Sequence, residues 1–216
     1  MSRHTILFDM DGVLIDSEIA MATSSIDSLK QHGISPVRED FIPFTGMGED
    51  AFISGVATKY GLTYTTAMKD EAYRIYAQER KDLIEVFPGI HEMIVELKRR
   101  GYRIAVASAA DLVKVKVNLI CIGFTPEDFD AVVTGSDVEK KKPDPEIYLK
   151  AAAAVGVSTD DCIVVEDAIS GIKAGLAAGA VVIGVTSTFD AQTLRDAGAS
   201  VAVNHTPELL EHLSSL

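Results

Sequence analysis

Two aspartates near the start of the chain have the spacing of a catalytic pair. Asp9 and Asp11 follow an apolar run at residues 5–8, and Gly12 then lets the backbone turn. Residues two apart in an extended chain point to the same side, so both carboxylates should lie on one face. Beside a metal ion, one carboxylate can stay ionised and attack while the other holds a proton for a leaving oxygen. A solvated acidic turn is the alternative, which the apolar run and the glycine disfavour.

A second acidic pair ends another apolar run. Glu166 and Asp167 follow residues 162–165, and Ser170-Gly171 opens a predicted helix shortly afterwards. Carboxylates at the carboxyl end of a strand can supply oxygen ligands to a hard cation such as Mg²⁺. Capping of the following helix is the alternative use of these acids.

The charge balance sets a condition on any anionic substrate. The 216 residues carry a formal net charge of −12, which argues against nucleic acid or an anionic membrane as the main partner. A phosphorylated molecule can bind such a protein only through a local group of cations. Lys140-Lys141-Lys142 precedes Pro143, and a residue before proline favours extended backbone, so Lys142 can be held at a fixed angle. A solvated charge run is the ordinary alternative.

A hydroxyl residue ends a further apolar run. Ser108 follows residues 103–107, so its hydroxyl and the next backbone amides, beginning with Ala109, could bind phosphate oxygens. Serine also caps helices, but Asp111 is the more obvious N-cap here. We therefore predict a phosphate contact at Ser108 and Ala109.

Short apolar runs alternate with helical patterns through most of the chain. Runs with little polar alternation are typical of parallel strands covered on both faces. The order indicates an α/β fold with a doubly wound, Rossmann-like parallel sheet, in which ligands bind at the carboxyl ends of the strands. Each candidate residue above lies at or after such an end. The predicted strands are residues 5–8, 103–107, 131–134, 162–165 and 181–185, and the predicted helices are 90–100, 112–122, 146–155, 171–178 and 191–196.

One region interrupts this alternation. Between residues 17 and 86 the patterns are helical, with no convincing strand. We therefore predict a core domain of residues 1–16 and 87–216, with a helical cap domain at 17–86 inserted after the first strand. Residues 44–49 are either a substrate loop or an ordinary turn before a helix. The predicted cap helices are residues 19–31, 49–59 and 65–81.

The remaining composition is that of an ordinary globular protein. Hydrophobic residues make up 47% of the chain and charged residues 24%. Cys121 and Cys162 lie in apolar runs without a metal-binding spacing, so we expect reduced, mostly buried thiols. No signal peptide and no run of about 20 apolar residues is visible, so we expect a cytoplasmic protein. The oligomeric state is not specified, and a monomer is compatible with the sequence.

The four motifs, taken in order, resemble those of the haloacid dehalogenase superfamily. The closer likeness is to its phosphatases and β-phosphoglucomutases that carry a helical cap after the first strand, and it covers nearly the whole chain. Because dehalogenases of this family lack a second acid, Asp11 favours phosphate chemistry. The matching motifs are Asp9-x-Asp11-Gly12, Ser108, Lys142 in Lys-Pro-x-Pro, and Glu166-Asp167.

The resemblance implies a role for each matching residue. Asp9 would attack phosphorus and form an aspartyl-phosphate. Asp11 would protonate the leaving group and then activate the water or sugar hydroxyl that accepts the phosphoryl group. The implied substrate is a small phosphorylated metabolite such as a sugar phosphate, bound through Ser108 and Lys142. The implied cofactor is Mg²⁺, held by Asp9, the Asp11 backbone carbonyl, Glu166 and Asp167.

The chain departs from β-phosphoglucomutases in the cap. Those enzymes carry a histidine a few residues after a stretch that resembles Asp16-Ser17-Glu18, whereas residues 19–22 here read Ile-Ala-Met-Ala. The difference favours a phosphatase, with a β-phosphoglucomutase-like hexose phosphate isomerase as the alternative. Arg80 and Lys81 are candidate cap cations. A non-catalytic binding protein on the same fold is a third hypothesis, but such a protein is expected to have lost a nucleophile or a metal ligand.

Overall fold

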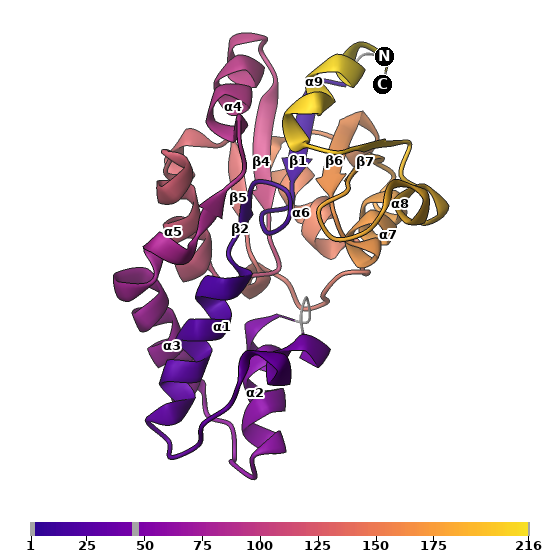
Figure 1. The fold of residues 1–216 in the computed structure, drawn as a ribbon. Helices are drawn as coiled ribbons and strands as arrows, with labels where there is room; N and C mark the ends of the chain where they lie inside the picture. The colour runs from indigo at the N-terminus through magenta and orange to yellow at the C-terminus, as the bar shows by residue number, and fades with distance from the viewer. Residues whose placement is uncertain (1–2, 45–47, 216) are drawn as a thin grey trace.

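The protein consists of two lobes (Figure 1). The computed structural model describes residues 3–44 and 48–215. The larger lobe is built on a parallel sheet and holds both ends of the chain, and the smaller lobe is helical. Among the described residues, no helix is long and apolar enough to cross a membrane. The expected cytoplasmic location stays a prediction.

The larger lobe is built on a six-stranded sheet in which all neighbouring strands are parallel. In sheet order its strands are β5 (Ala131–Val133), β4 (Arg103–Ala107), β1 (Thr5–Phe8), β6 (Cys162–Glu166), β7 (Val181–Val185) and β8 (Val201–Val203). Leu7 of the central strand β1 pairs with Ala105 of β4 and with Val164 of β6. The strand order changes direction at β1, which opens a crevice at the carboxyl ends of these three strands.

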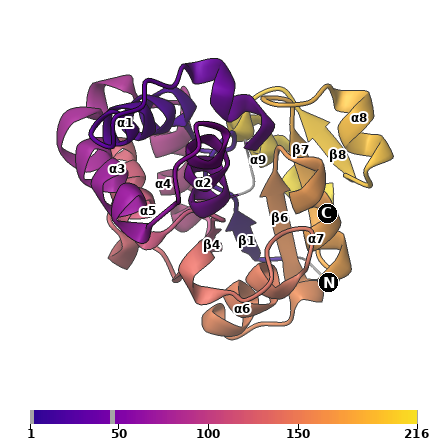
Figure 2. The same cartoon turned by 90° about the horizontal axis from the view of Figure 1, so that it is seen from below.

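Helices cover both faces of this sheet (Figure 2). They are α4 (Ile90–Arg99), α5 (Leu112–Ile122), α6 (Glu146–Val155), α7 (Ile169–Ala177), α8 (Ala191–Asp196) and α9 (Leu209–His212). Ile6 and Phe8 pack against α4, α5 and α9, whereas Leu7 packs on the opposite face against α6, α7 and α8. Burial on both faces explains why β1 has a continuous apolar sequence. The predicted doubly wound α/β class is confirmed.

Three short strands were not predicted. β8 is only three residues long, and β2 (Ile15–Asp16) and β3 (Glu85–Val86) have two residues each. A segment of two residues cannot display the periodicity that identifies a strand. The expectation of no strand between residues 17 and 86 is therefore wrong at β3. The predicted helices are all present, with ends that differ by at most two residues.

The smaller lobe is a helical cap. Its helices are α1 (Glu18–Lys30), α2 (Glu49–Lys59) and α3 (Thr66–Glu79), with a 3₁₀ segment at Arg38–Phe44. Leu29, Phe41, Phe52 and Tyr76 are buried together in its own apolar cluster. A separate core is what a separate folding unit requires.

The two crossings between the lobes lie side by side. β2 and β3 form an antiparallel ribbon in which Ile15 pairs with Val86 and Asp16 with Glu85. The predicted domain boundaries, after residue 16 and before residue 87, coincide with the ends of this ribbon. That coincidence supports our proposal of a core at 1–16 and 87–216 and a cap at 17–86.

Helix α5 of the core also docks on the cap. Val117 packs in the apolar cluster of the cap, and the Tyr76 hydroxyl of α3 donates to Asn118 of α5. Lys69 of α3 forms an ion pair with Asp111, with 2.9 Å between Nζ and Oδ2. The two cysteines are free, with Cys162 buried and Cys121 half-buried.

Truncation of the central strand should destabilise the protein strongly. Leu7 is fully buried, so Leu7→Ala removes apolar contacts and leaves a cavity, which should lower the free energy of unfolding by about 3 kcal/mol in urea titrations. The control is Leu149→Ala, at a side chain of α6 that is 46% exposed, with an expected change within about 0.5 kcal/mol. Equal effects of the two substitutions would contradict the placement of β1.

Candidate active site

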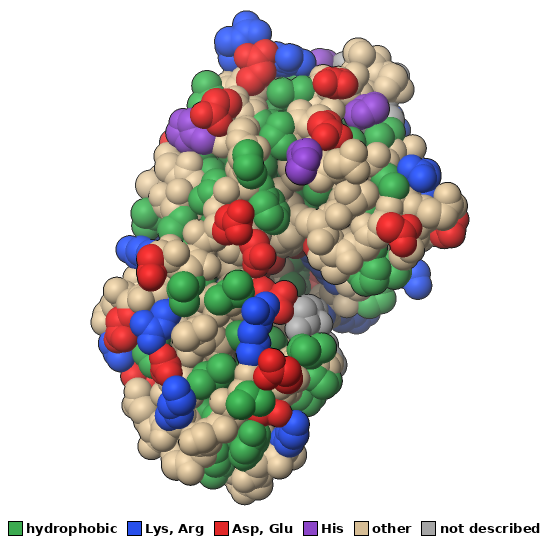
Figure 3. All heavy atoms as spheres, viewed as in Figure 1, with side chains coloured by type: hydrophobic (Ala, Val, Ile, Leu, Met, Phe, Trp, Pro, Cys, Tyr) green, Lys and Arg blue, Asp and Glu red, His purple; other side chains and the backbone are tan. Residues whose placement is uncertain are grey.

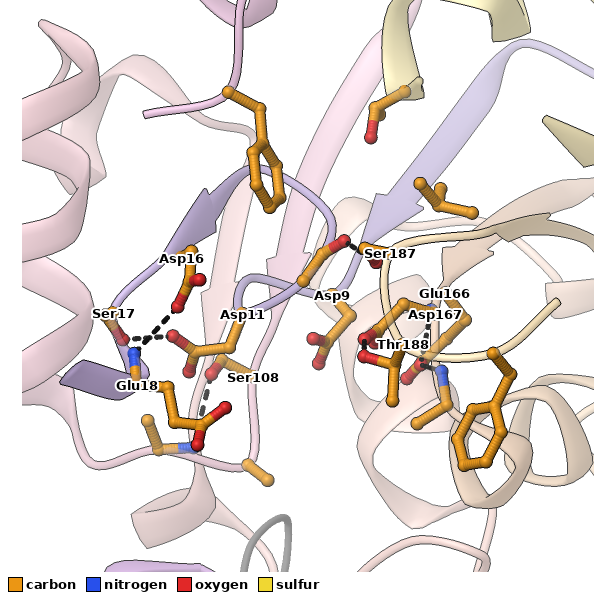
Figure 4. Close-up of a pocket in the computed structure, with 18 of the residues that line it drawn as sticks. Asp9, Asp11, Asp16, Ser17, Glu18, Ser108, Glu166, Asp167, Ser187 and Thr188 are labelled. Atoms are coloured by element: carbon orange, nitrogen blue, oxygen red, sulfur yellow. Dashed lines mark hydrogen bonds between the residues drawn. The ribbon is translucent and has the colours of Figure 1, made fainter. Parts of the chain in front are cut away.

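The first loop after β1 places its two aspartates by burying the residues around them. The Asp9 amide donates to the Val165 carbonyl at 3.0 Å, which extends the pairing of β1 with β6 beyond the strand. Met10 is fully buried, as is Leu14, whose amide donates to the Met10 carbonyl at 2.9 Å. These anchors leave the carboxylates of Asp9 and Asp11 directed into the cavity (Figure 4).

Three buried carboxylates meet at the carboxyl ends of β1 and β6. Oxygens of Asp9, Glu166 and Asp167 all lie within 4.8 Å of one another. Burial raises the pKa of Asp9 well above its ordinary value, although the Lys142 ammonium acts in the opposite direction. Burial and the Glu166 carboxylate raise the pKa of Asp167 to about 7. An all-oxygen donor set with an excess of negative charge fits a hard divalent cation such as Mg²⁺.

Lys142 reaches this cluster from the loop between β5 and α6. Its Nζ lies 2.5 Å from Asp9 Oδ1 and 2.6 Å from Glu166 Oε1, and it also donates to the Ala107 carbonyl at 3.2 Å. Burial alone would lower the Lys142 pKa, but the carboxylates of Asp9 and Glu166 raise it, so the side chain is an ammonium. The lysine is therefore held against the predicted nucleophile.

Glu166 is occupied on both oxygens by protein groups. Its Oε1 accepts from Lys142 and, at 2.7 Å, from the Tyr148 hydroxyl, and its Oε2 accepts from the backbone amides of Asp167 and Ala168 at 3.1 Å each. A carboxylate held in this way fixes Lys142 and the turn that carries Asp167. Of the two predicted metal ligands in this motif, Asp167 is the better placed to accept a cation.

The loop after β7 supports Asp167 and the first loop. The Thr188 hydroxyl donates to Asp167 Oδ2, and the Ser187 hydroxyl donates to the Gly12 carbonyl. Gly12 has a φ of 77°, and a Cβ placed there would lie 2.1 Å from Asp167 Oδ2. Only glycine therefore lets the first loop approach this carboxylate so closely.

Ser108 lies at the opposite side of the cluster, after β4. Its side chain is buried, and its Oγ accepts from the Ala110 amide at 3.2 Å, which leaves the hydroxyl hydrogen for another acceptor. Ala109 also lines the cavity. Asp111 occupies the N-cap position of α5 as expected, but it makes no capping hydrogen bond and instead accepts from Ser136 and Lys69.

Asp11 is held through both carboxylate oxygens. Oδ1 accepts from the Ser17 hydroxyl, and Oδ2 lies 2.8 Å from Nζ of Lys114. Lys114 is itself buried and lies 3.3 Å from Glu49 Oε1 of the cap. Burial alone would lower the Lys114 pKa, but the carboxylates of Asp11 and Glu49 raise it.

A cavity of about 1250 Å³ lies above these groups, between core and cap. It is lined by Asp9, Asp11 and Lys142 at one end and by cap residues such as Met21 and Phe52 at the other. Figure 3 shows that the surface is hollowed where the two lobes meet. A cavity of this size can hold a small metabolite, with one part of it near Asp9, Asp11 and Lys142 and the rest against the cap.

Comparisons with known proteins settle the family. The model of the haloacid dehalogenase-like hydrolases matches residues 6–185. The chain belongs to this family. A hexitol phosphatase A from Escherichia coli (strain K12) is 31% identical over 88% of this chain and 86% of its own length.

A longer plant protein and a solved structure are also similar to this chain. SUPPRESSOR OF QUENCHING 1, a chloroplastic protein of Arabidopsis thaliana, is 38% identical over 91% of this chain, which spans only 19% of that much longer protein. A β-phosphoglucomutase structure from Clostridium difficile superposes with a TM-score of 0.80 at 23% identity, covering 98% of this chain and 96% of the other. At that identity the likeness shows the fold alone. The predicted superfamily and enzyme class, a haloacid dehalogenase-like hydrolase, are confirmed.

In this hydrolase the structure brings the predicted core residues to one end of one cavity, although their roles stay predictions. The lining includes Asp9, Asp11, Ser108, Ala109, Lys142, Glu166 and Asp167. The candidate cap cations lie elsewhere, because Arg80 pairs with Asp27 and neither Arg80 nor Lys81 is among the described residues that line the cavity. In the segment 44–49, which the sequence leaves open as a substrate loop or an ordinary turn, Phe44, Gly48 and Glu49 line the cavity, whereas residues 45–47 lie outside the described residues.

Sequence reasoning missed four residues that support the site. Thr188 and Ser187 follow β7, so the rule that placed the other candidates at strand ends could have identified them. Tyr148 and Lys114 lie inside helices, where no local pattern separates a buried polar contact from an ordinary helical position. Their contacts depend on where the helices pack.

Gly12→Ala should lower catalytic activity in addition to the stability that it loses through backbone strain. A Cβ at residue 12 would displace the Asp167 carboxylate, so we expect activity to fall by about 10- to 100-fold. Gly33→Ala is the matched control, because Gly33 has a φ of 82° with open space around it. Both variants should lose about 1 kcal/mol of stability through the left-handed conformation, but only Gly12→Ala should lose activity. Equal activities would contradict the close approach.

The buried Asp167 carboxyl should give a pH dependence to stability. Its pKa rises from an ordinary 3.8 to about 7 on folding, so the folded protein binds more protons than the unfolded chain between these values. The free energy of unfolding in EDTA should therefore fall as pH rises from about 4 to about 7, by on the order of 2–4 kcal/mol relative to Asp167→Asn. Added Mg²⁺ should reduce the fall in the free energy of unfolding between about pH 4 and about pH 7. A difference between the two proteins that stays constant with pH would refute the prediction.

Proposed function

We propose that this protein is a Mg²⁺-dependent phosphatase that hydrolyses small phosphorylated metabolites through an aspartyl-phosphate on Asp9. The observation that carries the proposal is the position of Asp9, buried 2.5 Å from the Lys142 ammonium at the floor of the cavity between core and cap. A carboxylate held in this way can attack a phosphate that the same lysine binds.

Mg²⁺ would be held by Asp9, Asp167 and the backbone carbonyl of Asp11. Glu166 would support this site by accepting hydrogen bonds from Lys142 and from the Asp167 amide. When bound, the ion supplies positive charge that offsets repulsion between a carboxylate and a phosphate. The buried acids of this site outnumber the lysine that contacts them, so the residues present fit such an ion. Thr188 would fix the orientation of Asp167.

The protein groups then divide the chemistry between them. Lys142, the Ser108 hydroxyl and the Ala109 amide bind the phosphate oxygens, and an Asp9 oxygen forms a bond to phosphorus as the bond to the leaving oxygen breaks. Asp11 gives its proton to that leaving oxygen. Asp11 then takes a proton from water, which attacks phosphorus and releases Asp9 and inorganic phosphate.

The charge of the cavity favours a substrate with one phosphate. Besides the core acids, Asp16, Glu18, Glu49 and Glu85 line it. The lysines among the described lining residues are Lys114, Lys141 and Lys142, and each already donates to a carboxylate or a backbone carbonyl. A second phosphate would be repelled by these carboxylates, whereas the hydroxyls of a sugar or polyol can donate hydrogen bonds to them. The similarity to a hexitol phosphatase agrees with this substrate class.

A β-phosphoglucomutase-like isomerase is the alternative function. The similarity of fold to such a mutase favours it. A mutase that uses a bisphosphate must accommodate two phosphates, which the acidic lining opposes. The cap segment after Ser17 also lacks the histidine found in the mutases.

The direct test is a phosphate-release screen over sugar, polyol and other phosphomonoesters, with Mg²⁺ or EDTA. We expect Mg²⁺-dependent release by the wild type and a loss of at least about 10³-fold in Asp9→Asn. Asp70→Asn, at an exposed cap aspartate, is the matched control and should retain activity.

Other outcomes of the screen would favour the other hypotheses. Exchange between hexose 1- and 6-phosphates on addition of a hexose bisphosphate, without phosphate release, would support the mutase. Metabolite binding without turnover, unchanged in Asp9→Asn, would support a non-catalytic protein.

A further inference from the structure

We propose that Lys114 is a positioning residue that holds Asp11 in its working orientation, and that Glu49 of the cap holds Lys114. The inference rests on the proposed function, because it concerns the carboxyl group assigned there as proton donor. The sequence alone does not indicate this contact, since Lys114 lies in the first turn of a helical pattern, at residues 112–122, that carries no recognisable motif.

The contact is built from three parts of the chain. Lys114 extends from α5, Asp11 lies in the loop after β1, and Glu49 is the first residue of α2 in the cap. Nζ of Lys114 is 2.8 Å from Asp11 Oδ2 and 3.3 Å from Glu49 Oε1, so the catalytic carboxyl is the nearer partner. The exposed fractions of the Lys114 and Glu49 side chains are only 8% and 10%.

Two donors on different sides restrict the Asp11 carboxyl. Ser17 donates to Oδ1 from the junction of β2 and α1, and Lys114 donates to Oδ2 from α5. The Asp11 side chain nevertheless remains 37% exposed, and Asp11 lines the cavity. The carboxyl is thus fixed in direction and still open to a substrate.

Stability alone does not account for a lysine at this position. A buried ion pair loses much of its attraction to the cost of removing both charges from water, and a well-packed apolar residue often serves equally well. Neighbours of Lys114 on the same helix, Val115 and Val117, are buried apolar residues. A lysine that contacts the catalytic acid and the cap together has a functional explanation.

Glu49 makes the arrangement depend on the position of the cap. Lys114 has two carboxylate partners only while Glu49, at the start of α2, stays against it. The same helix α5 carries Asn118, which accepts from Tyr76 of the cap. Lys114 is therefore anchored on the face of the core that the cap covers, and Glu49 steadies it when substrate is enclosed.

The role of Asp11 as proton donor predicts how a loss of Lys114 would be observed. An alkyl phosphate has a strongly basic leaving oxygen that needs a proton, whereas p-nitrophenolate leaves without one. The value of kcat/KM reports steps up to formation of the aspartyl-phosphate. A proton donor that is no longer held in position should therefore lower kcat/KM for alkyl phosphates far more than for p-nitrophenyl phosphate.

The experiment compares these two substrates in one set of variants. For Lys114→Met we expect the ratio of kcat/KM for the best alkyl phosphate of the screen to that for p-nitrophenyl phosphate to fall about 10- to 100-fold. The ratio does not depend on the fraction of active enzyme, so partial misfolding cannot imitate the effect. Lys114→Arg should restore part of the ratio, and Glu49→Gln should lower it less than Lys114→Met does. Lys116→Met, at an exposed lysine of the same helix, is the control and should leave the ratio unchanged.

Asp11→Asn separates failure of this inference from failure of the proposed function. If Asp11→Asn lowers the ratio and Lys114→Met does not, Asp11 is the proton donor and the inference about Lys114 is wrong. If Asp11→Asn lowers kcat/KM equally for both substrates, the assignment of Asp11 as proton donor in the proposed function fails. A parallel loss on both substrates in Lys114→Met would indicate a structural role only.

Discussion

A single ammonium group faces three buried carboxylates at the centre of this molecule, and the rest of the structure is arranged around that imbalance. Asp9, Glu166 and Asp167 carry three formal negative charges against the one positive charge of Lys142. Away from water such an excess is costly, which is why the pKa values of Asp9 and Asp167 rise. A divalent cation would neutralise the remaining two negative charges. The excess charge that destabilises the folded protein therefore favours the binding of a metal.

The fold supplies the constraint that keeps these charges together. Asp9 directly follows β1 and Glu166 ends the adjacent parallel strand β6, and the pairing of Phe8 with Val165 brings the two acids close together. Both are buried, so neither can move without disturbing the centre of the sheet. Lys142 comes from a different loop, but Tyr148 and Glu166 hold its position. The lysine is also 5.0 Å from the centre of the Tyr148 ring, which adds a cation–π contact. The residues that we propose to act at phosphorus therefore lie at the buried centre of the sheet.

The extent of prediction from sequence follows from the same physics. The carboxyl ends of parallel strands all lie at one edge of a sheet. Once a strand is recognised in the sequence, the residue that follows it can therefore be assigned to a shared site. Asp9, Ser108 and Glu166 are found in this way. No comparable rule exists for Lys114 or Tyr148, because a position on a helix is fixed only when the helix packs. β2 and β3 were not predicted for a different reason, since two residues carry too little pattern to distinguish a strand from a loop.

The ribbon of β2 and β3 has a consequence for how enzymes of this architecture can diversify. Asp16 and Glu85 are paired neighbours, although 68 residues separate them along the chain. The cap therefore joins the two strands of the ribbon in the way that a hairpin turn would, so its length and sequence can change without altering the strand order of the core or the position of Asp9, the predicted nucleophile. Such an insertion point lets substrate selectivity change through replacement of one continuous segment while the chemistry is inherited intact. Helix α5 limits this freedom, since any new cap must still match the surface that Lys114 and Asn118 present.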